Sequence, residues 1–217
     1  MNRWLMALAV LTSIPAIASR AQAGQFNSVL SIGDPAPAWK DLPGVDGKRH
    51  SLADLQDCEI VVVVFTCNSC PIASDYEDRI IAFAKKYCVQ GQKTGRGQKT
   101  ALVAINVNTV EEDLLPQMKE RAAAKHFPYP YLFDESQKIG KAYGALFTPE
   151  FFVLDKDRKI AYMGAFDDNV EPTKTKHAYL EPAVQSILKG GKANPAETQA
   201  SGCLIRYARS RRRKPTT

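Results

Sequence analysis

The stretch IVVVVFTCNSCP, residues 60–71, decides the fold of this chain. Its first six residues are β-branched or aromatic without polar alternation, which is typical of a strand buried on both faces of a largely parallel sheet. The apolar run ends at Thr66. Pro71 suits the first turn of a helix, where a missing N–H removes no hydrogen bond. The pattern therefore predicts a buried strand, a short loop that carries two cysteines, and a helix.

The two cysteines of this loop, Cys67 and Cys70, are expected at the N-terminus of the helix, where unpaired amides and the helix dipole favour a thiolate. A free cysteine has a pKa of about 8.5, and such settings lower it to roughly 3.5–7.5. Thiol–disulfide exchange needs an ionised attacking sulfur and a second thiol that resolves the mixed disulfide. We expect an exposed Cys67 to attack and a more buried Cys70 to resolve. A structural disulfide or two unpaired thiols is the alternative.

The rest of the apolar pattern alternates between strands and helices. Expected helices cover residues 71–88, 110–126, 136–143 and 175–188. Expected strands cover residues 101–107 and 131–133, with hairpins at 38–52 and 151–164. This order predicts an α/β fold in which helices flank a mixed central sheet, extended by an N-terminal hairpin.

The N-terminus has the pattern of a secretory signal over residues 1–23. Arg3 supplies the positive charge, residues 5–17 are almost wholly apolar, and Ala21-Gln-Ala23 resembles a cleavage site; residues 16–18 offer an earlier one. The apolar stretch is short for a membrane span, which needs about 20 residues. An uncleaved anchor is the alternative. We therefore expect export to a periplasm or the outside, where disulfides can persist.

The domain itself is expected over residues 24–192, followed by a disordered linker and basic tail over residues 193–217. The formal net charge of +6 comes from residues 203–217, which carry six basic residues and no acid. The tail could contact anionic lipid. Export argues against a nucleic-acid partner, and the oligomeric state is left open.

Five cysteines leave at least one thiol free or shared. Cys58 and Cys88 are expected to be packing residues. Cys203 follows Gly202 in the expected linker and could serve as a resolving thiol, pair with another cysteine or stay free. The three histidines are isolated from one another, so no metal site is expected, and a dithiol needs no cofactor.

Residues 32–188 resemble the thioredoxin-like superfamily, on its peroxiredoxin-like branch and in the group of redoxins that carries a CxxC motif. The resemblance is carried by the stretches GDPAP (33–37), SL (51–52), FTCNSCP (65–71), TPEFFVLD (148–155) and GC (202–203). It implies a thioredoxin-like fold in which Pro149 is a cis-proline that faces the dithiol. Thr148 and Pro149 would then offer a backbone edge to a substrate peptide.

Two other activities of this superfamily remain open. Peroxiredoxins place their reactive cysteine in a Pro-x-x-x-Thr-x-x-Cys frame; with Cys70 as that cysteine, Val63 and Cys67 replace the proline and threonine. Copper chaperones use CxxxC with a distant histidine, for which His177 is the candidate here. The sequence favours an exported thiol–disulfide oxidoreductase that acts on thiol- or disulfide-bearing proteins and exchanges electrons with an unidentified donor. A peroxide-reducing antioxidant enzyme is the first alternative, and a copper carrier the second.

Overall fold

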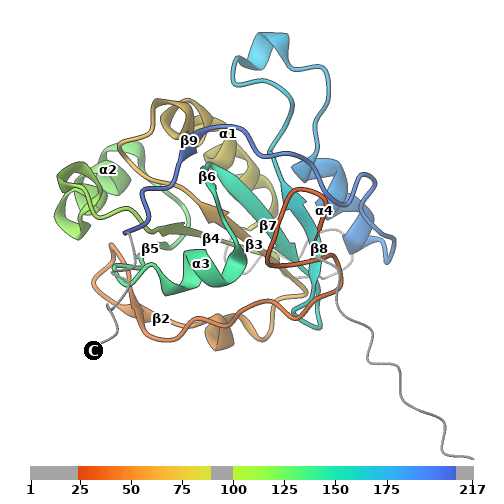
Figure 1. Ribbon diagram of the computed structural model, residues 1–217, viewed down its shortest axis with the longest axis horizontal. Helices are drawn as coiled ribbons and strands as arrows, with labels where there is room; N and C mark the ends of the chain where they lie inside the picture. The colour runs from red at the N-terminus through yellow and green to blue at the C-terminus, as the bar shows by residue number, and fades with distance from the viewer. Residues whose placement is uncertain (1–23, 89–99, 209–217) are drawn as a thin grey trace, which may run out of the picture.

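The computed structural model describes residues 24–88 and 100–208 of the chain (Figure 1). The signal predicted over residues 1–23 lies outside the described residues, as does the end of the basic tail, residues 209–217. Within the described ranges, no helix is long and apolar enough to cross a membrane.

A five-stranded mixed sheet forms the centre of the molecule, in the order β5-β4-β3-β7-β8. The central strand β3 pairs in parallel with β4 and antiparallel with β7, while β4–β5 is parallel and β7–β8 antiparallel. The bounds are β3 Ile60–Phe65, β4 Thr100–Asn106, β5 Tyr131–Phe133, β7 Glu150–Leu154 and β8 Ile160–Gly164. The thioredoxin-like α/β fold predicted from the sequence is confirmed.

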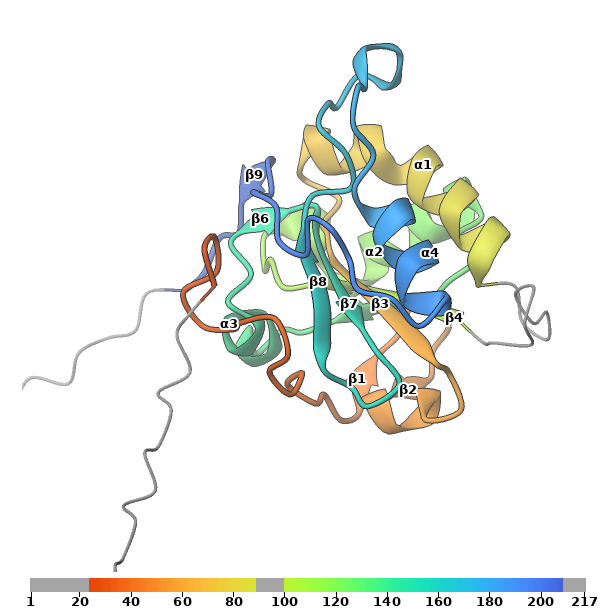
Figure 2. The same cartoon turned by 90° about the vertical axis from the view of Figure 1, so that its right-hand side faces the viewer.

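Alternate residues of β3 pack on opposite faces of the sheet. Ile60, Val62 and Val64 belong to one apolar cluster, whereas Val61, Val63 and Phe65 belong to another. The first face is covered by α1 (Pro71–Tyr87), α2 (Leu115–Lys125) and α4 (Leu180–Leu188). The second face is covered by α3 (Lys138–Tyr143) and the N-terminal segment (Figure 2). Burial on both sides explains why β3 shows no polar alternation.

Two helices begin later than the sequence predicts. The expected helix at residue 110 starts with a 3-10 turn, η2 (Glu111–Asp113), and α2 begins only at Leu115, with proline in its first turn. Residues 175–179 do not join α4, because His177 accepts a hydrogen bond from the Asp168 amide and Ala178 bridges to Asp167. A further 3-10 turn, η3 (Pro172–Lys174), lies in the same protruding loop.

The N-terminal hairpin is present but short, with β1 (Leu42–Pro43) pairing β2 (Arg49–His50) before the 3-10 turn η1 (Leu52–Leu55). Two further short strands, β6 (Phe147–Thr148) and β9 (Cys203–Leu204), form an antiparallel pair beside the main sheet. Figure 1 shows β9 beside β6, at the end of the sheet where α1 begins.

The C-terminal segment corrects the predicted domain boundary at residue 192, because residues 193–208 pack against the domain. Thr198 donates its amide to the Met163 carbonyl, Ile205 is buried, and the Tyr207 hydroxyl donates to the Ala145 carbonyl at 2.8 Å. Backbone pairing and apolar burial hold this segment in place. Its path brings Cys203 to the end of β3.

Candidate active site

Cys67 and Cys70 lie in the loop that joins β3 to α1. Cys70 is the N-cap residue of α1, and its sulfur accepts a hydrogen bond from the Ala73 amide at 3.3 Å. Cys67 lies three residues earlier, outside the helix. Of the two sulfurs, Cys70 therefore receives the N-terminal amides that favour a thiolate.

Both sulfurs are buried, with exposed fractions of 3% for Cys67 and 1% for Cys70. Thr148 covers them: its hydroxyl lies 3.5 Å from the Cys67 sulfur, and its carbonyl accepts from the Cys70 thiol at 3.2 Å. The prediction that the attacking Cys67 sulfur is exposed is therefore wrong as regards its exposure. The sulfur lies beneath the β6–β9 pair.

The pKa values of the two thiols shift in opposite directions. The Cys67 thiol, as a hydrogen-bond donor, lowers the pKa of Cys70 well below its usual range, against the opposing effect of burial, and the Cys203 thiol adds to the lowering. The same hydrogen bond to Cys70, together with burial, raises the pKa of Cys67. These contacts favour ionisation at Cys70 over Cys67; while Cys70 is protonated, its thiol donates to the Thr148 carbonyl.

The loop between the two cysteines is held by Asp113, the last residue of η2. Its fully buried carboxylate accepts hydrogen bonds from the Asn68 amide at 2.7 Å, the Ser69 amide at 2.9 Å and the Ser69 hydroxyl at 2.6 Å. Only the expected strand order could have indicated this contact from the sequence. Since β3 and β4 are parallel neighbours, the segments after their carboxyl ends meet at one edge of the sheet.

Thr148 and Pro149 lie opposite the cysteines, and the peptide bond between them is cis. The adjacent carboxylate of Glu150 is buried and accepts the amides of Leu146 at 2.7 Å and Phe147 at 3.0 Å, which fixes the loop before Pro149. The structure therefore brings Cys67, Cys70, Thr148 and Pro149 together. The backbone edge of Thr148 is already occupied, however, because this residue pairs with Cys203.

Cys203 is half-buried and packs against the small cluster formed by Cys67, Cys70 and Ala73. Gly202 makes this approach possible, because a Cβ at this position would lie 2.1 Å from the Thr148 carbonyl oxygen. A side chain at residue 202 would push β9 away from β6. The third predicted site cysteine therefore lies beside the other two.

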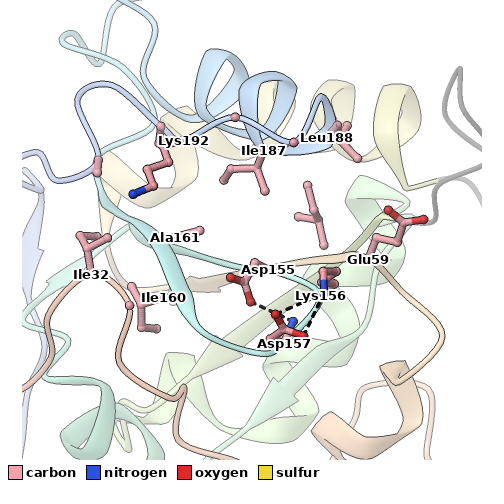
Figure 3. A pocket seen from close by; sticks show the side chains of 16 residues that line it. Ile32, Glu59, Asp155, Lys156, Asp157, Ile160, Ala161, Ile187, Leu188 and Lys192 are labelled. Carbon is pink, nitrogen blue, oxygen red and sulfur yellow. Dashed lines mark hydrogen bonds and ion pairs between the residues drawn. The ribbon is translucent and has the colours of Figure 1, made fainter.

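A cavity of about 430 Å³ opens beside Pro149 and is lined by the side chains of Ile72, Tyr76, Pro149 and Phe166 among others. Its wall is braced by Asp167, which accepts from the Tyr76 hydroxyl at 2.8 Å. A larger cavity of about 580 Å³ lies at the opposite end of the sheet, where Ile60 begins β3 and Asp155–Asp157 turn between β7 and β8 (Figure 3). The cavity beside Pro149 is the nearer of these two to the cysteines, because its lining includes Ile72, two residues after Cys70.

The remaining cysteines and the candidate copper ligand are not at this site. Cys58 and Cys88 lie before β3 and after α1. His177 is exposed in the loop before α4, so its expected place on the last helix is corrected. Across residues 24–88 and 100–208, no group of three or more histidine, cysteine, aspartate or glutamate side chains is arranged to hold a metal ion.

Comparison with known proteins identifies the family. The redoxin family model matches residues 31–179. The chain belongs to the redoxin family. No curated protein matches the sequence.

Two solved structures resemble this redoxin over nearly their whole length. A hypothetical protein from Sinorhizobium meliloti 1021 shares 32% identity, with 84% of this chain and 97% of that chain covered and a TM-score of 0.73. An uncharacterized conserved protein from Geobacillus kaustophilus shares 29% identity, with 88% and 96% covered and a TM-score of 0.73.

A more distant similarity concerns the fold alone. The C-terminal domain of a proposed thiol-disulfide oxidoreductase from Bacteroides thetaiotaomicron shares 16% identity, with 74% of this chain and 98% of that chain covered and a TM-score of 0.54. Together the family match and these structures establish a redoxin with a thioredoxin-like fold.

Proposed function

We propose that this redoxin is a thiol–disulfide oxidoreductase in which Cys67 and Cys70 carry the electrons as a dithiol or a disulfide. The observation that carries the proposal is the environment of Cys70. Its sulfur caps α1, accepts the Ala73 amide and lies opposite the cis-proline loop at Thr148. A thiolate at a helix N-terminus with a second thiol as its neighbour is the arrangement that disulfide exchange requires.

The proposed reaction needs no cofactor, because the two electrons reside in the sulfurs. A reduced pair attacks a substrate disulfide, forms a mixed disulfide and then closes the Cys67–Cys70 bond, releasing a substrate dithiol; the reverse sequence oxidises a substrate. The lowered pKa of Cys70 favours this sulfur as the attacking thiolate, whereas the sequence favours Cys67 in that role. The main cause is the hydrogen bond from the Cys67 thiol, to which the Ala73 amide at the start of α1 adds.

Peroxide reduction is not favoured as the main activity. At the position where the peroxiredoxin frame supplies a threonine hydroxyl, this chain carries the Cys67 thiol, and the proline position is Val63, a fully buried residue inside β3. Copper carriage has no support at the site, since no histidine of residues 24–88 and 100–208 joins the cysteines in a group that could hold a metal ion.

Export completes the proposal. In a periplasm or outside the cell a dithiol of this kind would act on thiol- or disulfide-bearing proteins and exchange electrons with a separate donor or acceptor. Thr148, Pro149 and the cavity beside them would receive the substrate, and the basic tail could add contact with an anionic membrane surface.

The proposal is tested by comparing wild type, Cys67→Ser and Cys70→Ser in two assays: reduction of insulin disulfides and consumption of hydrogen peroxide. We expect disulfide reduction in wild type and its loss in both variants, with slow peroxide consumption throughout. If Cys67→Ser kept full peroxidase turnover while no form reduced insulin, the site would be a peroxidase and the proposal would be wrong.

A further inference from the structure

The redox pair is closed off from protein substrates by the protein's own C-terminal segment. Cys67 and Cys70 are 3% and 1% exposed. The backbone edge of Thr148, which a substrate peptide would pair with, instead pairs with β9, in the register Phe147 opposite Leu204 and Thr148 opposite Cys203. A substrate cysteine therefore has no direct path to either sulfur while β9 is in place.

The segment that blocks this edge places a cysteine where a substrate cysteine would lie. Cys203 stands opposite Thr148 in the β6–β9 pair and packs against the cluster of Cys67, Cys70 and Ala73. It is half-buried, whereas the other two sulfurs are buried. Of the three, Cys203 is the one that molecules outside the protein can meet.

Cys70 is the central sulfur of the three. It interacts with the side chains of both Cys67 and Cys203, and it is the sulfur that accepts the Ala73 amide. A thiolate stabilised in this way is a good leaving group in disulfide exchange, because a thiol of low pKa leaves faster. This favours the step in which a substrate thiolate attacks a Cys70–Cys203 disulfide and Cys70 leaves, and the contacts of Cys70 with both neighbours allow it to pair with either.

We propose that Cys203 is a relay cysteine, which passes disulfides between protein substrates and the buried Cys67–Cys70 pair through a Cys70–Cys203 disulfide. This inference rests on the proposed function, since it takes the oxidised Cys67–Cys70 pair as its starting point. It extends that function by naming the sulfur that faces the substrate.

The exchange balances without any further oxidant. The Cys203 thiolate attacks the Cys70 sulfur; the Cys70–Cys203 bond forms as the Cys67–Cys70 bond breaks, and Cys67 leaves as a thiolate that takes up a proton. A thiolate of a substrate dithiol then attacks Cys203, and Cys70 leaves as the thiolate. The second substrate thiol displaces Cys203, so the substrate is oxidised by two electrons and the pair is reduced by two.

The first test asks whether a Cys70–Cys203 disulfide forms because the fold places Cys203 beside Cys70. Full-length protein with Cys58→Ser, Cys88→Ser and Cys67→Ser keeps Cys70 and Cys203, and is oxidised with diamide. Peptide mass mapping should find an intramolecular Cys70–Cys203 disulfide in most molecules. The matched control adds Cys203→Ser and Leu204→Cys, which moves the thiol by one residue on the same segment to a side chain that is 66% exposed.

We expect at least tenfold less intramolecular disulfide in this control, because adjacent residues of a strand point to opposite sides. Equal yields in the two proteins would mean that any thiol on this segment can reach Cys70, whatever its position, and would overturn the relay.

The second test asks whether the bond is used. Cys203→Ser in the otherwise wild-type chain should slow insulin reduction about tenfold or more, while the Cys67–Cys70 pair still forms its disulfide under diamide. Unchanged insulin reduction would overturn the relay and leave the proposed function intact. Absence of insulin reduction and of a Cys67–Cys70 disulfide in wild type would instead overturn the proposed function, whatever Cys203 does.

Discussion

The two ends of the β3–α1 unit each carry a pair of cysteines, and the two pairs lie in opposite environments. Cys67 and Cys70 lie between the end of β3 and the start of α1. Cys58 precedes β3, and Cys88 is the C-cap residue of α1. All four residues are cysteines that flank the same strand and the same helix. Differences in their reactivity must therefore come from their positions and surroundings.

At the start of the helix, free amides and a neighbouring thiol stabilise negative charge on Cys70. Cys88 lies at the C-terminal end of the helix, where the helix dipole opposes a thiolate. Burial, together with the nearby Cys58 thiol, raises the pKa of Cys88 to about 12. The comparison teaches that hydrogen-bond donors at a buried sulfur decide its acidity: Cys70 has the Cys67 thiol and the Ala73 amide, whereas burial and the Cys58 charge dominate at Cys88.

The largest contrast between the two ends should be in activity. Cys70→Ser should lower insulin reduction by about 100-fold or more, because it removes the thiolate and the sulfur common to both proposed disulfides. Cys88→Ser should leave the rate within about twofold of wild type. A loss of similar size in Cys88→Ser would break the comparison, since it would place the second pair in the reaction.

The next largest effect should come from Asp113, which braces the loop only at the first end. Asp113→Asn loses charge-assisted hydrogen bonds to two amides and one hydroxyl, and should lower the free energy of unfolding by about 2 kcal/mol. It should also lower the pKa of Cys67, because the carboxylate is one cause of its rise. Urea unfolding and thiolate absorbance against pH measure the two effects.

Ser69→Ala is the comparison variant for Asp113→Asn, because it keeps the carboxylate and removes the hydroxyl that donates to it, which also contacts the Cys67 sulfur. It should cost about 1 kcal/mol and raise the pKa of Cys67, the opposite direction to Asp113→Asn, because the hydrogen bond from Ser69 lowers that pKa. If both variants behaved alike, the negative charge of Asp113 would have no role of its own.

The stability of the reduced protein should depend on pH through the first pair. Folding lowers the pKa of Cys70, so between that lowered value and about 8.5 the unfolded state binds more protons, and stability rises with pH. Above about 8.5 the raised pKa of Cys67 reverses the slope. We expect a rise of about 1.4 kcal/mol for each pKa unit of lowering, from urea unfolding at several pH values.

The oxidised protein is the control for this profile, because its Cys67–Cys70 disulfide has no proton to lose. The pH-dependent difference between reduced and oxidised protein should persist in Cys88→Ser and vanish in Cys70→Ser. If the difference vanished in Cys88→Ser instead, the titrating thiol would be Cys88, and the assignment to Cys70 would be wrong.

The smallest effect should follow from Gly202→Ala. The new Cβ meets the Thr148 carbonyl and displaces β9, so alkylation of Cys203 should accelerate about fivefold, while the alkylation rates of Cys58 and Cys88 stay unchanged. The free energy of unfolding should fall by about 1 kcal/mol, because β9 is a short edge pair. Ser201→Ala, at the exposed neighbouring position, should change neither quantity.

The fold and part of the site could be predicted from the sequence. The uniform apolar run of β3 and Pro71 in the first turn of α1 are local signals, so the elements that carry Cys67 and Cys70 were predicted, and α1 begins at the predicted residue. The burial of Cys67 was not predicted, because Thr148, which covers it, is distant in the sequence. The brace from Asp113 and the pairing of Cys203 with Thr148 depend on contacts between distant residues, which no local pattern records.

The central claim is tested most directly by a redox titration of the full chain. The protein is equilibrated with thiol–disulfide buffers of graded potential, quenched with an alkylating agent, and analysed by intact mass and peptide mapping. We predict one two-electron transition that removes two alkylatable thiols from the group Cys67, Cys70 and Cys203, while Cys58 and Cys88 are alkylated throughout. Five alkylated cysteines at every potential, or a transition confined to Cys58 and Cys88, would contradict it.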